Sequence, residues 1–172
     1  MFLYGFRLFL LLWLLSGCAV KVASPQERET RVHQLTKILL AQSSKISRVE
    51  AEDVAKRSVF FAEDLSRQYK LVSPPLWHNT LVNVGLKKRG LCYEWANDMW
   101  TYLHRKVYKS LKIYYIGANI GTYFEHNALS ISAKGEDLNH SVIIDAWRDS
   151  GRLFFIELKK DKKYEWRERL DI

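Results

Sequence analysis

Four runs of β-branched and aromatic residues follow one another after residue 110, and they constrain the fold more than any other feature. The runs are LKIYYIGANI, HNALSISA, SVIIDAW and RLFFIEL, and polar or glycine-bearing breaks separate them. Runs of this composition predict β-strands. Asp149-Ser150-Gly151 lies between the last two runs and fits a short hairpin turn. We therefore expect the second half of the chain to form an antiparallel sheet.

The first half of the chain has helical spacing instead. Residues 24–27 (Ser-Pro-Gln-Glu) combine an N-cap serine, a proline at the first helical position and the glutamate of a capping box. Residues 47–50 (Ser-Arg-Val-Glu) repeat the box, and apolar residues at helical intervals continue to about Tyr69. A shorter helix opens at Ser73, before two prolines, and a fourth begins near Cys92. Helices followed by an antiparallel sheet predict an α+β fold.

Composition narrows the class of protein. A chain of 172 residues with 48% hydrophobic and 27% charged residues is typical of one globular domain. The net charge of +8 is spread along the chain with acidic residues interleaved, which suits contact with anionic surfaces of a cell envelope. We expect no nucleic-acid partner because the sequence has no nucleic-acid-binding motif.

The N-terminus has the features of a secretory signal. Arg7 precedes an apolar run from Leu8 to Leu15, which is too short to span a bilayer and is typical of the hydrophobic region of a signal peptide. Residues 15–18 (Leu-Ser-Gly-Cys) resemble a bacterial lipobox, in which the cysteine is acylated and becomes the first mature residue. We therefore expect residues 1–17 to be a lipoprotein signal peptide and Cys18 to carry lipid. The alternatives are an ordinary signal peptide and an uncleaved anchor.

Acylation of Cys18 has consequences for location and for the other cysteine. Several acyl chains on one residue anchor a protein more firmly than a single chain. Ala19 stands where an aspartate would resemble the inner-membrane retention signal, so we expect a lipid-anchored protein of the outer membrane that faces the periplasm. A lipid on Cys18 also leaves Cys92 without a second thiol for an intramolecular disulfide.

Cys92, in RGLCYEWANDMW, is the candidate nucleophile. It stands where a helix is expected to begin, and the unpaired N–H groups and the dipole of a helix N-terminus favour a thiolate. The same geometry directs the Cys92 amide toward the position of a developing oxyanion. The alternative is a small, buried and inert thiol.

A nucleophilic thiol needs a base, and the base needs a group that orients it. His126 opens one predicted strand. Asp145 lies within another that is otherwise apolar, where an unpaired ion is costly, so we expect an imidazole on a neighbouring strand as its partner. The alternative is that Asp145 faces solvent at a strand end. His140 is a rival base, but it precedes Asp145 on the same predicted strand, which is poor geometry for a pair.

These segments resemble a known group. RGLCYEWANDMW is similar to the active-site segment of the transglutaminase-like superfamily, in which a Gly-x-Cys motif opens the central helix of a papain-like core. EHNALSIS resembles the strand with that family's histidine and VIIDAW the strand with its aspartate. The bacterial transglutaminase-like cysteine proteinases are the nearest branch, and the resemblance covers Pro75 to Leu158. It implies that Cys92 is the nucleophile, His126 the general base and then acid, and Asp145 the group that holds the imidazole tautomer.

The chain departs from this family after its histidine. Several relatives have an aromatic residue two positions on, whereas this chain has Asn127-Ala128, a difference that concerns substrate preference more than the three catalytic residues.

An oxyanion needs a second hydrogen-bond donor, and we expect it in the segment PLWHNTLVN, which precedes Cys92. Asn79, His78 and Trp77 are candidates, although each residue type in this setting is more often a packing or capping group. Glu94 is two positions after Cys92 on the same predicted helix. It either faces the same cleft or, as is more usual, lies on a solvated helix face.

The sequence indicates neither a metal nor a cofactor. The cysteines and histidines lack the close spacing of a structural zinc site, no H-E-x-x-H occurs, and no glycine-rich phosphate loop is present. We divide the chain into the signal peptide, an N-terminal helical region at 18–73 and a catalytic core at 74–172. The core ends in a charged tail that is more typical of a solvated helix or a docked end than of a binding element.

The expected function is hydrolysis of amide or peptide bonds in peptides or proteins of the envelope by a Cys-His-Asp site. An amine in place of water as acyl acceptor would make the protein a cross-linking transglutaminase. Two non-catalytic alternatives are a lipoprotein that uses the same cleft for binding and one that binds anionic lipid through its basic tail. Nothing in the sequence sets an oligomeric state.

Overall fold

The computed structural model describes residues 23–170, so the expected signal peptide and Cys18 lie outside the described residues. Four α-helices are present in this part of the chain: α2 (Pro25–Gln42), α3 (Arg48–Gln68), α4 (Pro75–Asn83) and α5 (Cys92–Leu103). The strands are β1 (Leu111–Ala118), β2 (His126–Ala133), β3 (Ser141–Asp145), β4 (Phe154–Glu157) and β5 (Arg167–Glu168), with short 3₁₀ helices η1 (Leu138–His140) and η2 (Leu158–Lys160). Between residues 23 and 170 no helix is both long enough and apolar enough to cross a membrane.

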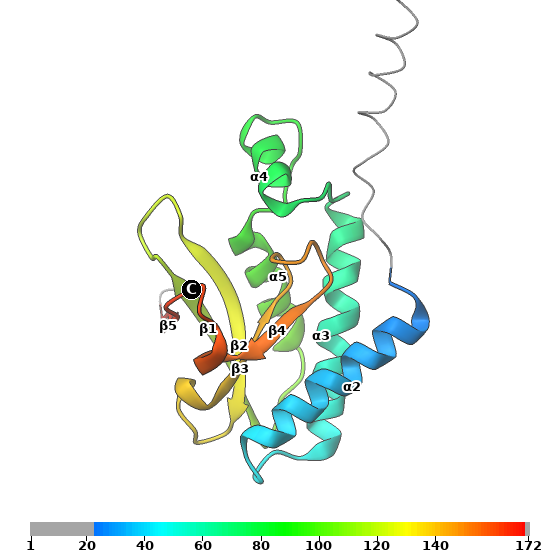
Figure 1. The fold of residues 1–172 in the computed structure, drawn as a ribbon, viewed down its shortest axis with the longest axis vertical. Helices are drawn as coiled ribbons and strands as arrows, with labels where there is room; N and C mark the ends of the chain where they lie inside the picture. The colour runs from blue at the N-terminus through cyan, green and yellow to red at the C-terminus, as the bar shows by residue number, and fades with distance from the viewer. Residues whose placement is uncertain (1–22, 171–172) are drawn as a thin grey trace, which may run out of the picture.

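The strands form one antiparallel sheet in the order β4-β3-β2-β1-β5 (Figure 1). The register of the central pair aligns Leu111 with Ala133 and Ala118 with His126. The predicted α+β class is confirmed. The register also brings the first residue of β2 to the end of the sheet at which β1 finishes.

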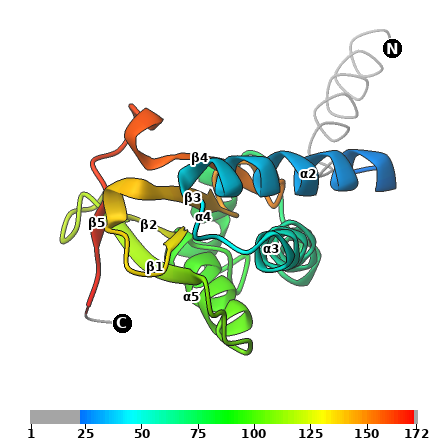
Figure 2. The ribbon, with the colours of Figure 1, turned by 90° about the horizontal axis from the view of Figure 1, so that it is seen from below.

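Both faces of the sheet are covered, so every residue of β2 is buried. Because successive strand residues point to opposite faces, alternate residues enter two different cores. On one face Leu129 and Ile131 pack with α2, α3 and α5, and on the other Ala128 packs with Tyr164 and Trp166 of the C-terminal segment. Figure 2 shows this segment on the side of the sheet away from α3 and α5. The N-terminal helices therefore share the main core with the sheet.

The two predicted capping boxes have different outcomes. Ser24 caps α2 as expected, because its hydroxyl accepts a hydrogen bond from the Glu27 N–H at 3.1 Å. The prediction of a capping box at the start of α3 was wrong, because the Ser47 side chain makes no capping hydrogen bond. The Glu50 carboxylate accepts instead from the N–H groups of Lys109 and Ser110, both at 2.7 Å. Glu50 thus joins α3 to the start of β1.

The connection between β3 and β4 is longer than the predicted short turn. The two strands pair antiparallel, as expected, but residues 146–153 lie between them. Gly151 has a φ of 85°, and a Cβ there would lie 2.5 Å from the Ser66 Cβ. Glycine therefore allows this loop to pack closely against α3.

The charged C-terminal tail is a docked end, one of the two expected forms. Trp166 is buried, and β5 pairs with β1 opposite Ile116 and Gly117. The Arg169 N–H donates to the Tyr115 carbonyl at 2.8 Å. The tail therefore covers the second face of the sheet.

Candidate active site

Cys92 is the first residue of α5, as the sequence predicted, and Glu94 closes the turn before it. The Glu94 carboxylate accepts from the N–H groups of Gly90 at 2.7 Å and Leu91 at 3.0 Å, and it pairs with Arg89. Glu94 is thus neither a free group in a cleft nor a fully solvated one. It satisfies the amides that precede the helix and fixes the backbone on which Cys92 sits.

His78 holds the same loop from the other side. Its buried ring accepts from the Val72 N–H at Nδ1 (3.1 Å), so its Nε2–H donates to the Arg89 carbonyl at 2.9 Å. A Cβ on Gly90, whose φ is 130°, would lie 2.3 Å from His78 Nε2. His78 and Gly90 therefore fit together without spare room and set the path of the chain into α5.

His126 and Asp145 form a buried pair on neighbouring strands. His126 Nε2 lies 2.7 Å from Asp145 Oδ2. The other carboxylate oxygen accepts from the N–H groups of Trp147 (3.1 Å) and Arg148 (3.0 Å). Asp145 is buried, so the alternative in which it faces solvent is wrong. The partner expected from its apolar strand, an imidazole on the adjacent strand, is confirmed.

The Cys92 thiol completes a series of three side chains. It is half-buried and close enough to His126 to help raise the pKa of the imidazole. Because Nε2 of His126 faces Asp145, Nδ1 is the nitrogen that remains for the thiol. The thiol also lies 3.6 Å from the Glu125 carbonyl, to which it can donate. Residues from α5, β2 and β3 are thereby brought together in the order Cys92, His126, Asp145.

The pair carries opposite charges at neutral pH. Burial disfavours the imidazolium form of His126, but the Asp145 carboxylate and the Cys92 side chain outweigh burial and raise the pKa of His126 to about 9. Burial likewise opposes ionisation of Asp145, yet His126 and Arg148 hold the pKa of this carboxyl below its ordinary value. A protonated imidazole next to the thiol can deliver a proton to a leaving group.

Arg148 supports the pair and was not identified from the sequence. Its Nε donates to Asp145 Oδ2 at 3.1 Å, and its NH2 group donates to Asp161 Oδ2 at 2.9 Å. The same Asp161 oxygen accepts from the Trp166 indole N–H at 2.9 Å. The one available sequence signal was a cation directly after an apolar strand. Asp161 had none, since it lies in a run of charged residues.

Aromatic rings surround the imidazole. The ring centroids of Trp147 and Tyr164 lie 4.9 Å and 4.8 Å from that of His126, and Trp166 lies at 5.5 Å. Two of these rings belong to the C-terminal segment, whose role at the site the sequence did not reveal. This segment therefore shields the histidine from water on the face of the sheet opposite α5.

The three oxyanion candidates on α4 occupy different surroundings. Trp77 is exposed, and both ring nitrogens of His78 are used by the main chain. The Asn79 side-chain oxygen accepts from the Trp147 indole N–H at 3.1 Å, which leaves the amide NH2 group of Asn79 available to donate. Since Trp147 also contacts His126, Asn79 is the candidate that the contacts connect to the site.

The rival base His140 lies in η1, at the opposite end of β3 from Asp145. Its ring is exposed and Nδ1 pairs with Asp137 at 2.9 Å. The preference for His126 over His140 as the partner of Asp145 is therefore confirmed. Among residues 23–170 no cluster of three or more histidine, cysteine or acidic side chains is suited to hold a metal ion.

An open groove of about 550 Å³ is lined by Tyr93, Trp100, Glu125 and Arg169, among others. Tyr93 and Glu125 are the sequence neighbours of Cys92 and His126, but neither Cys92 nor His126 lines the groove.

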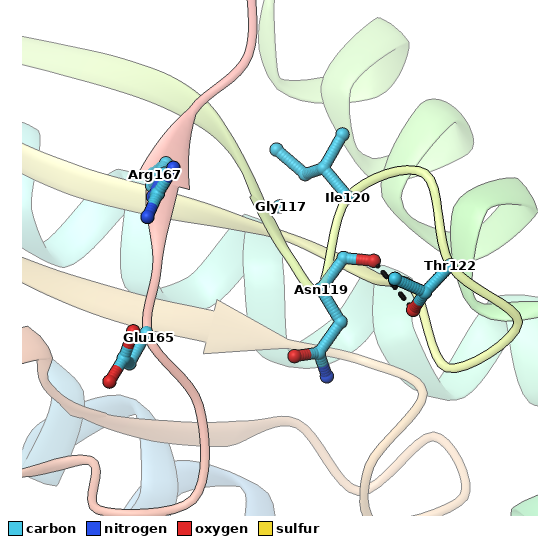
Figure 3. Close-up of a pocket in the computed structure, with 6 residues that line it drawn as sticks. All are labelled: Gly117, Asn119, Ile120, Thr122, Glu165 and Arg167. Carbon is cyan, nitrogen blue, oxygen red and sulfur yellow. Dashed lines mark hydrogen bonds between the residues drawn. The ribbon is translucent and has the colours of Figure 1, made fainter.

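A second pocket, of about 240 Å³, lies between the β1–β2 connection and the C-terminal segment (Figure 3). The Thr122 hydroxyl donates to the Asn119 carbonyl at its rim, and Glu165 and Arg167 line the other side. None of its lining residues belongs to the Cys92, His126 and Asp145 series.

Comparisons of the chain with protein-family models, curated proteins and solved structures find no match. The resemblance to the transglutaminase-like superfamily therefore stays a prediction. What the site can do has to be argued from its own geometry and charge.

Proposed function

We propose that this chain is a thiol-dependent acyl-transfer enzyme that hydrolyses amide or peptide bonds. The observation that carries the proposal is the placement of Cys92 at a helix N-terminus beside His126, whose imidazole lies 2.7 Å from the buried carboxylate of Asp145. A Cys-bearing helix packed on an antiparallel sheet that holds the histidine and aspartate is also the basis for proposing a papain-like, transglutaminase-like core.

The geometry supports a two-step reaction. The Cys92 thiolate attacks the substrate carbonyl carbon, and the protonated His126 ring delivers its proton to the leaving amine as the C–N bond breaks. His126, now neutral, takes a proton from water, and the water oxygen attacks the thioester carbon. The C–S bond breaks, which releases the acid and restores the Cys92 thiolate and the protonated His126 ring. Asp145 keeps the imidazole oriented throughout.

The oxyanion of each step needs hydrogen-bond donors. The Cys92 N–H belongs to the first turn of α5, where amides have no carbonyl partner within the helix. We assign the second donor to the side-chain amide of Asn79, whose oxygen is fixed by Trp147.

The location of the enzyme rests on the sequence. We propose removal of residues 1–17, acylation of Cys18 and attachment to the outer membrane on its periplasmic side. Peptides or proteins of the envelope are then the accessible substrates. In this proposal residues 18–73 form an N-terminal helical region and residues 74–172 the catalytic core.

The first test measures the reactivity of Cys92 with iodoacetamide across pH, resolved by peptide mass spectrometry. We expect His126→Ala to slow alkylation of Cys92 at least about tenfold near neutral pH, because the imidazolium that favours the thiolate is lost. His140→Ala is the matched control and should leave the rate unchanged. Equal rates in the wild type and both variants would contradict an activated thiol and favour a non-catalytic binding cleft.

The second test separates hydrolysis from transamidation. Envelope peptides are incubated with the protein and a primary amine, and the products are identified by mass. Hydrolysis yields a new carboxylate and transamidation an amine adduct, and Cys92→Ala should abolish either product. Release of the amine adduct alone would replace the hydrolase by a cross-linking enzyme.

A further inference from the structure

The outer surface of α4 and the turn after it exposes large apolar side chains. Leu76 is 69% exposed, Trp77 48%, Val84 62% and Leu86 73%, and we call these four residues the α4 surface. Figure 1 shows α4 projecting beyond the sheet at one end of the molecule. A contiguous group of exposed apolar side chains marks a contact site, whereas singly exposed apolar residues are ordinary on protein surfaces.

The α4 surface is not needed for packing within the chain. The opposite side of the helix makes its internal contacts through His78, which holds the loop before Cys92, and Asn79, which contacts Trp147. The helix therefore has an inner side that contacts the rest of the fold and an outer side on which Leu76, Trp77 and Val84 are exposed, together with the polar Thr80 and Asn83.

The segment around the α4 surface is basic. From Lys70 to Tyr93 the sequence contains four lysines and arginines and not one aspartate or glutamate, although the chain has 19 acidic residues. Arg89 is paired with Glu94 and Asp98, whereas Lys87 reaches back to the Lys70 carbonyl at 2.8 Å. Lysines at positions 70, 87 and 88 thus border the apolar side chains.

This combination favours a lipid surface over a protein. Interfaces between proteins are depleted in lysine. An apolar helix side with an exposed tryptophan and flanking lysines is typical of segments that lie in the headgroup region of a membrane. A segment that has lysines and no acidic residues is complementary in charge to anionic lipid, and each lysine near the lipid surface adds to the attraction.

We propose that the α4 surface lies in the headgroup region of an anionic bilayer. The inner side of the same helix holds the loop into Cys92, so this contact places the candidate active site next to the membrane. The proposal stands on described residues and requires neither catalysis nor acylation of Cys18.

The test uses the full chain with vesicles of phosphatidylglycerol and phosphatidylethanolamine whose acyl chains carry bromine close to the headgroups. Bromine quenches tryptophan fluorescence on contact, and the difference between wild type and Trp77→Phe isolates the signal of Trp77. We expect this difference signal to be quenched at least about twofold. The difference between wild type and Trp100→Phe, a half-buried tryptophan of α5, is the matched control and should be unaffected. The other tryptophans are the same in the two proteins of each comparison, so their signal cancels.

Charge reversal tests the anionic part of the proposal. In Lys87→Glu/Lys88→Glu, or with vesicles of neutral phosphatidylcholine, quenching of Trp77 should decrease toward the value without bromine. No quenching of Trp77 in anionic vesicles overturns the proposal, and equal quenching in neutral vesicles overturns the preference for anionic lipid. Alkylation of Cys92 in the lysine variant should match the wild type, so failure here is distinguishable from failure of the proposed enzyme.

Discussion

Arg148 offers the sharpest test of how the candidate site is held together. Its guanidinium bridges Asp145 at 3.1 Å and Asp161 at 2.9 Å, and the Arg148 side chain is only 9% exposed. Arg148→Met removes the charge but keeps most of the apolar bulk that packs on the Phe154 ring. The variant therefore leaves two buried carboxylates without their shared cation.

The expected loss of stability follows from the burial of both carboxylates. Removing one partner of a buried ion pair costs about 3–5 kcal/mol, because the remaining charge stays desolvated. Both carboxylates keep other donors: Asp145 retains His126 and two backbone N–H groups, and Asp161 retains the Trp166 indole and the Lys163 N–H. We therefore expect the lower end, a loss of about 3 kcal/mol in the free energy of unfolding.

Arg152→Met is the matched control, because the same loop carries it and its side chain is 55% exposed beside Glu27. A surface pair of this kind contributes less than about 1 kcal/mol. Urea unfolding followed by tryptophan fluorescence measures both variants, with the denaturant slope compared to verify that the unfolded states are alike. Arg148→Lys should recover part of the loss, since it restores the charge without the two-pronged geometry. Equal losses for the two methionine variants would refute the reasoning.

Three further predictions concern the loop before Cys92 and the His126–Asp145 pair. Gly90→Ala places a methyl carbon 2.3 Å from His78 Nε2. Its loss in the free energy of unfolding, measured with denaturant, should exceed that of Gly85→Ala by about 1–3 kcal/mol, because Gly85 has a positive φ but a Cβ there meets no atom within 4 Å. Equal losses would argue against the contact. The raised pKa of His126 makes the stability contributed by its protonation complete below about pH 6.5 and lost as pH rises through about 9. The gap in unfolding free energy between wild type and His126→Gln should therefore shrink between about pH 6 and about pH 10, and a constant gap would exclude this linkage. Asp145→Asn removes the carboxylate that raises the pKa of His126, so the alkaline limb of the acyl-transfer rate should move to lower pH. A pH–rate profile with an unmoved limb would count against the pairing.

Features set by neighbouring residues could be predicted from the sequence. The cap of α2 needs only Ser24 and the backbone three residues on, and β1 to β4 lie within the four runs that predicted strands. The His126–Asp145 pair was predictable for a different reason. A carboxylate in an apolar strand requires a partner, and few side chains at the predicted sheet end could supply one.

Features that join distant segments left no local pattern. Glu50 has the spacing of a capping residue, but Ser110 and Lys109 offer it three donors that only the folded chain brings near. Asp161 stands in a charged run that is typical of solvated surface, so its bond to Arg148 was not foreseeable. β5 has two residues, too few to give alternation.

The docking of residues 161–168 over His126 has a consequence for protein synthesis. Translation proceeds from the N-terminus, so Cys92, His126 and Asp145 leave the ribosome before Asp161, Tyr164 and Trp166 do. During that interval the nascent chain contains the three reactive side chains but lacks the acid that pairs with Arg148 and the rings that enclose the imidazole. The final electrostatic environment of His126 therefore depends on this late segment lying across the sheet.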